Sequence, residues 1–465
     1  MYHRQTVVEP YVRDASKTHP DGARASEPVI LTPAPMSRLS LALVVALALA
    51  GCRSEQAPAA PSPSAAADAE PHPSFLYGRV TTVGGETYEG RLRFGGGEEA
   101  FWGDYFNGFE DENPWAAHVP PERLAERRRP VEIFGIEVGH EDDLGRPFMA
   151  RFGDIAKLEA RGGDLRVTLK SGTVVHLDRY AADDFADGLR VWDDRHGVVD
   201  LHERQVRSIE FLPPARTGAA PSRLHGTVRT RRGAFTGFLQ WNREEGVGLD
   251  ALDGRTADGE PLSLRFDAIR SIERRARDSS LVTLRDGRTV VLTGTREVGR
   301  GNGGVYVDDA RYGRVLVSWD AFERADLSAA DSSGPAYGDF PPGHPLTGRV
   351  ATRDGRRLAG RLVYDLDESE TTETLDAPSG GVDYTIPFGL VASIELPGGE
   401  GEAARVTLHS GEALPLARAG DLGEGNAGLL VFAEGGEGAE YVPWAEVERV
   451  DFDRPAATYP PVGGG

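Results

Sequence analysis

The stretch Val282-Thr283-Leu284-Arg285-Asp286-Gly287, followed by Thr289-Val290-Val291-Leu292, decides the fold class of this chain. Apolar and polar residues alternate through the first segment, and an Asp-Gly pair separates the two. Alternation with a period of two, bounded by Asp-Gly, is typical of a β-hairpin with one buried face. The sequence therefore predicts two antiparallel strands here.

The same hairpin pattern recurs at Val167-Thr168-Leu169-Lys170-Ser171-Gly172 and at Val406-Thr407-Leu408-His409-Ser410-Gly411. Other anchors recur around it in one order, beginning with a glycine at Gly78, Gly226 and Gly348. Many anchors repeated in one order indicate internal repeats. We therefore predict three β repeats, called copy 1, copy 2 and copy 3, over residues 75–213, 224–328 and 345–453.

The composition favours an all-β architecture. The 465 residues include 58 glycines and 31 prolines, which favour turns and short strands over long helices. Each copy divides into two halves, and each half contains strand, turn, strand, a longer excursion and a final short strand. That order resembles the small five-stranded barrels of the Sm-like and SH3-like groups. The resemblance implies three tandem repeats, each a pair of small β-barrels.

The charge argues against a nucleic-acid partner. Lys and Arg number 52 against 73 Asp and Glu, which gives a formal net charge of −21. Binding to phosphate backbones needs an excess of Lys and Arg. The loop motifs by which Sm proteins hold RNA are not recognisable in this sequence. We expect no nucleic-acid binding.

The one cysteine, Cys52, ends a short apolar segment. Met36-Ser37-Arg38 supplies a positive start, and the run from Leu39 to Ala50 is too short to cross a bilayer as a helix. These are the parts of a secretory signal peptide. The end of the run, Leu49-Ala50-Gly51-Cys52, resembles the lipobox of bacterial lipoproteins. The resemblance implies cleavage before Cys52 and lipid attachment to its thiol. The alternative is a buried structural cysteine.

The lipobox resemblance implies a cellular location for the protein and a set of segment boundaries. The protein would be anchored in the bacterial cell envelope through Cys52, facing the periplasm or the exterior, and Arg53 after the cysteine favours the outer membrane. Met36 would be the true start. The expected segments outside the copies are a disordered upstream extension, the signal peptide, an Ala/Pro/Ser-rich linker and a disordered tail, at residues 1–35, 36–52, 53–74 and 454–465.

Copy 1 contains an insertion, residues 95–149, that is rich in aromatic residues. The aromatic spacing that runs from Phe101 to Phe109 matches one face of a short helix. Surface aromatics concentrate binding energy. The candidate patch for a protein or glycan partner therefore comprises Phe101, Trp102, Tyr105, Phe106 and Trp115. The alternative is that this face packs onto its own barrel.

Aromatic residues also stand at equivalent positions of the copies, and these we expect in the core: Trp319 and Trp444, and Phe94, Trp241 and Tyr364. Acidic clusters, by contrast, are expected to form exposed turns or loops. They are Asp183-Asp184, Asp193-Asp194, Asp308-Asp309, Glu244-Glu245 and the run from Asp365 to Asp376.

Signatures of common enzymes are not found. There is no His-Glu-x-x-His motif, no Gly-x-Ser-x-Gly elbow and no phosphate-cradling loop followed by a helix. We expect no catalytic residue, no metal site and no cofactor. The sequence favours a lipid-anchored binding or scaffold protein of the envelope, not an enzyme, whose tandem β domains engage a protein or glycan partner. The alternative is an envelope hydrolase that acts on polysaccharide through carboxylates of copy 1.

Overall fold

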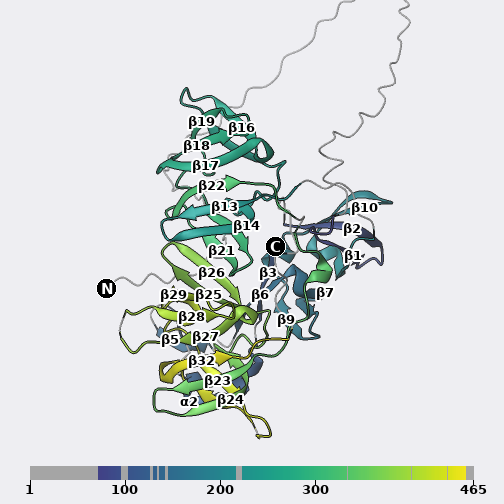
Figure 1. The fold of residues 1–465 in the computed structure, drawn as a ribbon. Helices are drawn as coiled ribbons and strands as arrows, with labels where there is room; N and C mark the ends of the chain where they lie inside the picture. The colour runs from purple at the N-terminus through teal and green to yellow at the C-terminus, as the bar shows by residue number, and fades with distance from the viewer. Residues whose placement is uncertain are drawn as a thin grey trace, which may run out of the picture. The chain divides into compact units, whose positions relative to one another are not determined.

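The structure is a computed structural model that describes residues 72–95, 103–110, 112–125, 129–133, 136–141, 145–215, 222–331, 334–399, 401–436 and 438–456. Within these residues most of the regular secondary structure is antiparallel strand, so the predicted all-β class is confirmed (Figure 1). No helix in these ranges has both the length and the hydropathy needed to span a membrane.

Copy 1 contributes twelve strands. They are β1 (Tyr77–Thr82), β2 (Thr87–Phe94), β3 (Tyr105–Glu110), β4 (Arg129–Ile133), β5 (Ile136–Glu141), β6 (Arg146–Arg151), β7 (Ile155–Arg161), β8 (Asp164–Leu169), β9 (Val174–Asp178), β10 (Leu189–Asp193), β11 (Gly197–Leu201) and β12 (Val206–Phe211). Its short helices are η1 (Pro114–His118), α2 (Pro121–Ala125), η2 (Phe152–Asp154), α3 (Asp183–Ala186) and η3 (Glu203–Gln205).

Copies 2 and 3 contribute ten strands each. Those of copy 2 are β13 (His225–Thr230), β14 (Gly233–Trp241), β15 (Ala251–Arg255), β16 (Pro261–Arg265), β17 (Ile269–Ala276), β18 (Ser279–Leu284), β19 (Thr289–Thr293), β20 (Val305–Asp309), β21 (Gly313–Val317) and β22 (Phe322–Leu327). Those of copy 3 are β23 (Thr347–Thr352), β24 (Arg357–Tyr364), β25 (Thr374–Ser379), β26 (Val382–Pro387), β27 (Val391–Glu395), β28 (Ala404–Leu408), β29 (Ala413–Leu416), β30 (Leu429–Phe432), β31 (Glu440–Val442) and β32 (Val447–Phe452).

Single turns of 3-10 helix punctuate copies 2 and 3 and the segment between them: η4 (Phe266–Ala268), η5 (Tyr337–Asp339), η6 (Phe388–Leu390), η7 (Gly420–Leu422) and η8 (Trp444–Glu446).

Eight strands follow one another in the same order in each copy. The order is β11-β10-β2-β1-β12-β7-β8-β9 in copy 1, and β31-β30-β24-β23-β32-β27-β28-β29 in copy 3. Copy 2 contains the same run, β21-β20-β14-β13-β22-β17-β18-β19, inside a twelve-stranded sheet. Each copy also carries a hairpin outside this order: β3–β6, β15–β16 and β25–β26.

The predicted pair of SH3-like barrels in each copy is not confirmed. The sheets are open, and strands from the two halves of a copy interleave in one sheet. In copy 1, for example, the closing strand β12 pairs with both β1 and β7, and β10 pairs with β2. The two halves therefore share their central strands.

The glycine anchors recognised in the sequence lie where neighbouring strands approach closely. A Cβ on Gly78, Gly226 or Gly348 would collide with a backbone carbonyl of β12, β22 or β32. The equivalent glycines of the second strands, Gly90, Gly237 and Gly360, have the same relation to the backbone of Trp192, Asp308 and Phe432. Glycine recurs at these positions because no side chain fits there.

A continuous ladder joins copies 2 and 3. Strand β21 of copy 2 pairs with β26 of copy 3, with Arg314 opposite Thr385 and Val317 opposite Val382. In Figure 1, β22, β13, β14, β21 and β26 follow one another across the junction. Buried residues of both copies belong to one hydrophobic core. The two copies therefore form a single packed body.

Buried ion pairs hold copy 1 against the other two copies. Asp104 accepts hydrogen bonds from Arg314 (2.8 Å) and Gln240 (2.9 Å) of copy 2. Arg146 lies between Glu110 of its own copy and Asp367 of copy 3, at 3.1 Å from the latter carboxylate. Breaking one partner of a buried pair leaves an uncompensated charge, so these contacts fix the placement of copy 1.

Two residues outside the predicted bounds of the copies are buried in the structure. Ser74, placed by the sequence in the linker of residues 53–74, is fully buried. Phe340, between copies 2 and 3, is 3% exposed and belongs to the hydrophobic core of copy 1. Composition placed Ser74 in the linker, and Phe340 lies outside the predicted bounds of the copies, whereas long-range packing includes both residues.

Candidate functional site

Copy 3 carries a groove with a volume of about 960 Å³. Strands β23, β24, β27, β28, β29 and β32 and the loop after β27 supply its walls. The lining residues are Ala351, Arg357, Glu395, Leu396, Pro397, Glu402, Ala403, Ala404, Arg405, Ala413, Leu414, Pro415, Glu448, Arg449 and Asp451. The groove is therefore a sheet surface with mixed charge.

A ladder of ion pairs crosses the floor of this groove. Arg449 pairs with Glu395 and, at 2.6 Å, with Asp451, and Arg405 lies 3.8 Å from Glu395. All four side chains are 39–66% exposed. Exposed pairs contribute about 0–1 kcal/mol each, so the ladder is better suited to presenting charge than to stabilising the sheet.

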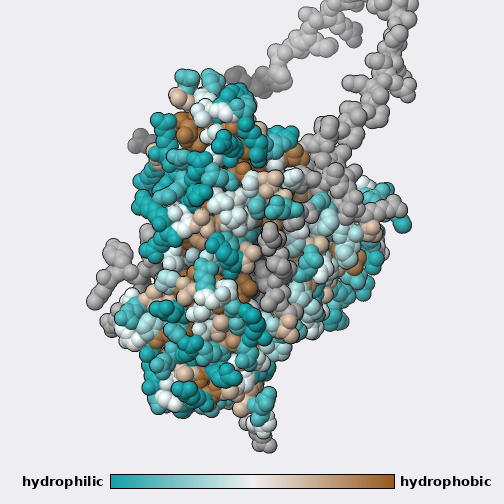
Figure 2. Space-filling model, viewed as in Figure 1, coloured by the Kyte–Doolittle hydropathy of each residue, from teal (hydrophilic) through white to brown (hydrophobic). Residues whose placement is uncertain are grey.

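Copy 2 repeats the ladder at equivalent positions. Arg324 pairs with Glu273 at 3.0 Å and with Asp326 at 2.7 Å. On copy 1, Arg79 pairs with Glu210, which is equivalent to Asp326, at 3.3 Å. The three sheets thus present related rows of alternating charge. Figure 2 shows a largely hydrophilic face on which hydrophobic residues form small, separate patches.

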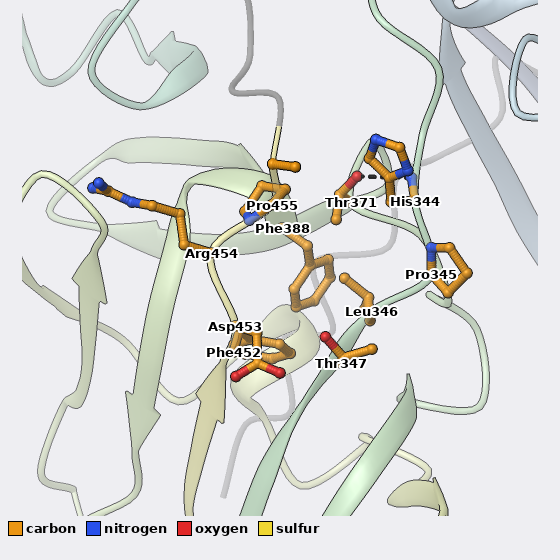
Figure 3. A pocket seen from close by; sticks show the side chains of 11 residues that line it. His344, Pro345, Leu346, Thr347, Thr371, Phe388, Phe452, Asp453, Arg454 and Pro455 are labelled. Carbon is orange, nitrogen blue, oxygen red and sulfur yellow. Dashed lines mark hydrogen bonds between the residues drawn. The ribbon is translucent and has the colours of Figure 1, made fainter. Parts of the chain in front are cut away.

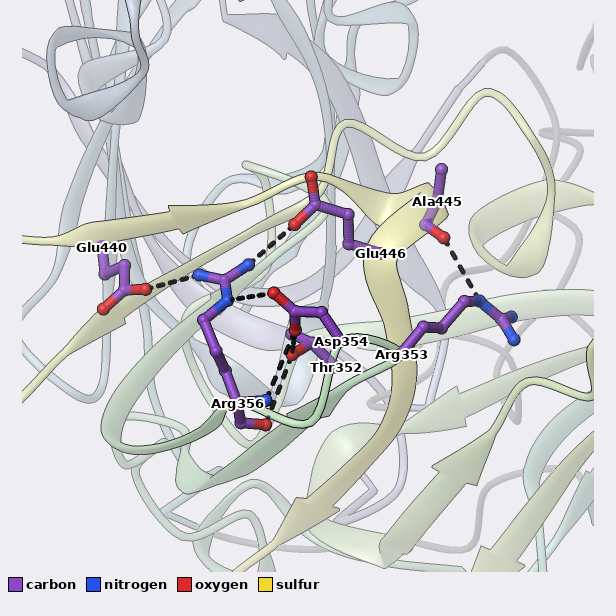
Figure 4. A network of polar contacts seen from close by, with 7 residues as sticks. All are labelled: Thr352, Arg353, Asp354, Arg356, Glu440, Ala445 and Glu446. Carbon is purple, nitrogen blue, oxygen red and sulfur yellow. Dashed lines mark hydrogen bonds and ion pairs between the residues drawn. The ribbon is translucent and has the colours of Figure 1, made fainter.

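A polar network fixes the β23–β24 turn at one end of the groove (Figure 4). The Arg356 guanidinium donates to Asp354 (3.0 Å), Glu440 (2.7 Å) and Glu446 (2.7 Å). Arg353 donates to the carbonyl of Leu396, a groove residue, at 3.2 Å. The turn is therefore tied to the loop that forms one wall of the groove.

A smaller cavity, about 210 Å³, lies at the end of the closing strand of copy 3 (Figure 3). The rings of Phe388 and Phe452 and the side chain of Leu346 supply its apolar wall, and His344 and Arg454 lie at its polar side. The other lining residues are Pro345, Thr347, Thr371, Asp453, Pro455 and Ala456. This volume is below the usual range for small-molecule sites and suits one side chain.

The aromatic insertion of copy 1 differs from its prediction. Residues Tyr105–Glu110 form strand β3, not a helix. Phe106 is fully buried among Phe94 and Phe152, with ring centroids 6.3 and 5.7 Å away. Tyr105, 8% exposed, lies on the other face of the strand under the Arg314 guanidinium. Both faces of β3 are covered, so these two rings belong to the interior.

Trp115 of the same insertion packs on copy 3. Its ring lies 6.2 Å from that of Phe432 and 5.2 Å from the Arg361 guanidinium. Of the predicted patch, Tyr105, Phe106 and Trp115 therefore make intramolecular contacts. Phe101 and Trp102 lie outside the described residues.

The expected core aromatics are confirmed as buried: Phe94, Trp241, Trp319, Tyr364 and Trp444. Most described residues of the acidic clusters, in contrast, were wrongly expected to be exposed, whereas Asp194 is exposed as expected. Every residue from Asp365 to Asp376 is buried or half-buried, as are Glu244 and Glu245. Asp193 and Asp309 are also buried, because each caps a turn and accepts a backbone N–H from the neighbouring strand, that of Glu89 and Thr236 respectively.

One repeated carboxylate was missed by the sequence reasoning. Asp184 accepts a hydrogen bond from the backbone N–H of Asn107 at 2.9 Å. Glu297 accepts from Asp253 (2.6 Å) in copy 2, and Asp421 accepts from Asp376 in copy 3. The signal was the acidic residue followed by an apolar one: Asp184-Phe185, Glu297-Val298 and Asp421-Leu422. In each copy it ties the outer hairpin to the loop before β10, β20 or β30.

Burial perturbs the carboxyl groups around this contact. Burial, and then the negative charge of Glu297, raises the pKa of Glu245 to about 8. Burial likewise raises the pKa of Glu373 to about 7 and that of Asp367 to about 6. The pKa values of Glu368 and Asp421 are raised well above their usual range for the same reason. A neutral carboxyl at Glu245, Glu368 or Asp421 avoids the cost of burying charge, whereas the Asp367 carboxylate is paired with Arg146.

Within the described ranges, no group of three or more His, Cys, Asp or Glu side chains is arranged to hold a metal ion. The proposed lipid-attachment residue, Cys52, lies outside the described residues. Comparison of the chain with protein-family models, with curated proteins and with solved structures finds no match.

Proposed function

We propose that this chain is a lipid-anchored binding or scaffold protein of the bacterial cell envelope. The observation that carries the proposal is the threefold repetition of one eight-stranded sheet whose exposed side presents rows of paired charges. Repeated surfaces on one chain convert weak contacts into avid binding. In this proposal the protein recognises a partner and catalyses no reaction.

The groove of copy 3 favours a protein partner over a glycan. Its lining has four carboxylates and three guanidinium groups but no aromatic ring. Aromatic rings would supply a stacking platform for sugar faces. Alternating charge instead complements another charged protein surface, where it sets specificity and the rate of association. The partner we propose is therefore an envelope protein with its own alternating charges.

The likeness to SH3-like barrel pairs stays a prediction, and the proposal does not depend on it. The alternative of a hydrolase using carboxylates of copy 1 gains no support from the contacts of these groups. Asp154 is held by Arg151 through two hydrogen bonds, at 2.6 and 2.9 Å, and Asp184 accepts the N–H of Asn107. Their charges serve internal contacts.

Membrane attachment is tested by Cys52→Ser. The lipobox resemblance implies that the thiol carries the acyl chains, which contribute about 0.8 kcal/mol per buried CH₂. We expect the variant to leave the membrane fraction while the native protein stays in it. Retention of the variant in washed membranes would refute the anchor at Cys52.

Partner binding is tested by crosslinking in native membranes, followed by quantification of the crosslinked partners. Arg405, 66% exposed in the groove, is changed to Glu. Arg288, 78% exposed on a turn of copy 2 outside the groove, is changed to Glu as the matched control. We expect Arg405→Glu to lose a partner that Arg288→Glu retains. Equal partner profiles for both variants would contradict a role for the groove.

A further inference from the structure

The segment between copies 2 and 3 inserts an aromatic residue into a site on copy 1. Phe340 lies over Gly153, and the Arg151 guanidinium lies 5.0 Å from the centre of its ring. Lys170 donates to the carbonyls of Tyr337 (2.5 Å) and Phe340 (3.0 Å). The site thus combines an apolar wall with a cation that satisfies backbone carbonyls of the inserted segment.

The 210 Å³ pocket of copy 3 lies beside the equivalent place in the repeat, where Thr371 and Pro455, two of its lining residues, stand over Gly389. The correspondence follows from shared backbone contacts: Lys170 donates its N–H to the carbonyl of Asp154, and His409 donates to that of Leu390. Each acceptor ends a Phe-Gly-x turn, Phe152-Gly153-Asp154 in copy 1 and Phe388-Gly389-Leu390 in copy 3.

The aromatic residues that line the pocket of copy 3 stand at the same repeat positions as aromatic residues around Phe340 in copy 1. Phe388 and Phe452 of the pocket are equivalent to Phe152 and Phe211, which share the core of copy 1 with Phe340. Arg454, at the rim of the pocket, supplies a cationic side chain near His409, whose carbonyl it contacts at 2.6 Å. Copy 3 therefore has an apolar wall like that of copy 1 beside a cavity, and the Arg454 side chain extends away from that cavity (Figure 3).

The sequence contains one further segment with the chemistry of the inserted one. Of the four Pro-Pro pairs in the chain, two follow an aromatic residue: Phe340-Pro341-Pro342 and Tyr459-Pro460-Pro461. Consecutive prolines favour an extended polyproline II conformation with a low entropic cost of docking, which aromatic-lined grooves recognise. Residues 457–465 lie outside the described residues, and Ala456, the last one before them, lines the pocket.

We propose that the pocket of copy 3 binds Tyr459-Pro460-Pro461 of the same chain, with the Tyr459 ring packed against Phe388 and Phe452, whose counterparts share the core of copy 1 with Phe340. Two residues separate Tyr459 from Ala456, and the three Cα–Cα steps between them span at most about 11 Å, so the segment starts within reach of the pocket. A tether this short gives an effective concentration of about the millimolar range, so weak intrinsic affinity suffices. The occupant is thus the carboxyl-terminal segment, and the pocket is a self-recognition site.

The test uses the chain ending at Ala456, the full chain and a fluorescent peptide of residues 457–465. Circular dichroism establishes that the shortened chain keeps the strand content of the full chain. We expect the peptide to bind the shortened chain at least tenfold more tightly than the full chain, whose pocket is occupied. A peptide carrying Tyr459→Ala should bind at least tenfold more weakly. No binding to the shortened chain, or equal binding of the two peptides, would overturn the proposal.

A matched pair of variants localises the binding. Thr347, which lines the pocket, and Arg349, two positions along the same strand but outside it, are both exposed. In the shortened chain, Thr347→Trp should abolish peptide binding and Arg349→Trp should leave it unchanged. Equal effects of the two would refute the pocket as the site. Sedimentation distinguishes docking within one chain from docking between two copies. A dimer that the full chain forms and the shortened chain does not would assign the pocket to the carboxyl-terminal segment of a second copy. That result would overturn docking within one chain.

Discussion

Phe340 packs so closely on Gly153 that a Cβ added to this glycine would lie 2.5 Å from the aromatic ring. Phe340 follows copy 2 in the sequence, whereas Gly153 lies in copy 1. The segment between two repeats therefore completes the core of the third. This relation makes the stability of copy 1 depend on residues that follow it by almost 200 positions.

Gly153→Ala should displace Phe340 and loosen copy 1. Because the ring cannot move without leaving its apolar site, we expect a loss of about 2–4 kcal/mol, similar to that of other overpacked or emptied core sites. Urea unfolding and limited proteolysis between Gly334 and Gly343 measure the effect. In copy 3 the equivalent Gly389→Ala meets its nearest atom only at 3.1 Å and should cost less. Equal losses at the two glycines would contradict the role of Phe340.

Asp104→Ala should destabilise the contact between copies 1 and 2. The substitution leaves the buried Arg314 with one of its two carboxylate partners, and breaking a buried pair costs about 3–5 kcal/mol. Asp200→Ala, which removes an exposed pair with Arg190, should cost less than about 1 kcal/mol. Chemical denaturation of both variants compares the two costs. Similar values would show that the Asp104 pair carries no more stability than a surface pair.

Gly313→Ala should uncouple copy 2 from copy 3. Gly313 has a φ of +91°, and its Cβ would lie 2.5 Å from Pro387 and 2.7 Å from the carbonyl of Thr385. Gly355 has a φ of +89° but no neighbour within 4 Å, so Gly355→Ala isolates the conformational cost, about 1–2 kcal/mol. We expect calorimetry to resolve two transitions for Gly313→Ala and one for Gly355→Ala. A single transition for both would contradict the coupling by this ladder.

Glu245 should make stability depend on pH. Its folded pKa of about 8 exceeds the usual 4.5, so its contribution is fully present below about pH 4.5 and is lost as pH rises through 8. Glu244, Asp250 and Glu297 add negative charge around it. Glu245→Gln keeps the shape but does not ionise. We therefore expect the melting temperature of the variant to fall less than that of the native chain as the pH is raised from 6 to 8.5. Parallel melting curves across that range would refute the raised pKa.

The repeat itself could be predicted from the sequence, because its anchors have local causes. Glycines at Gly78, Gly226 and Gly348 mark places where backbone approaches backbone, and such places recur wherever the sheet recurs. Strand pairing between copies could not be predicted in this way. The pairing of β21 with β26 depends on which edges meet in space, and no local pattern encodes that.

The misplaced helix has a physical reason. The rings of Tyr105 and Phe106 are neighbours in the sequence, which breaks the alternation expected of a half-exposed strand. In the structure one ring faces the core of copy 1 and the other faces Arg314 of copy 2, so both faces of β3 are buried. The acidic run from Asp365 to Asp376 was wrongly expected to be exposed for a similar reason. Arg146, from a segment distant in the sequence, pairs with Asp367, and no local pattern indicates this contact.

The ladder between β21 and β26 also limits how such a gene can be rearranged. Excising copy 3 would strip β21 of its neighbour and leave a bare row of N–H and C=O groups, a template for promiscuous aggregation. A further duplication could lengthen this sheet only if each added repeat also supplied a strand that pairs with the free edge. Copies 2 and 3 are therefore not independent units. A rearrangement of the gene that preserves the fold must move the two copies together.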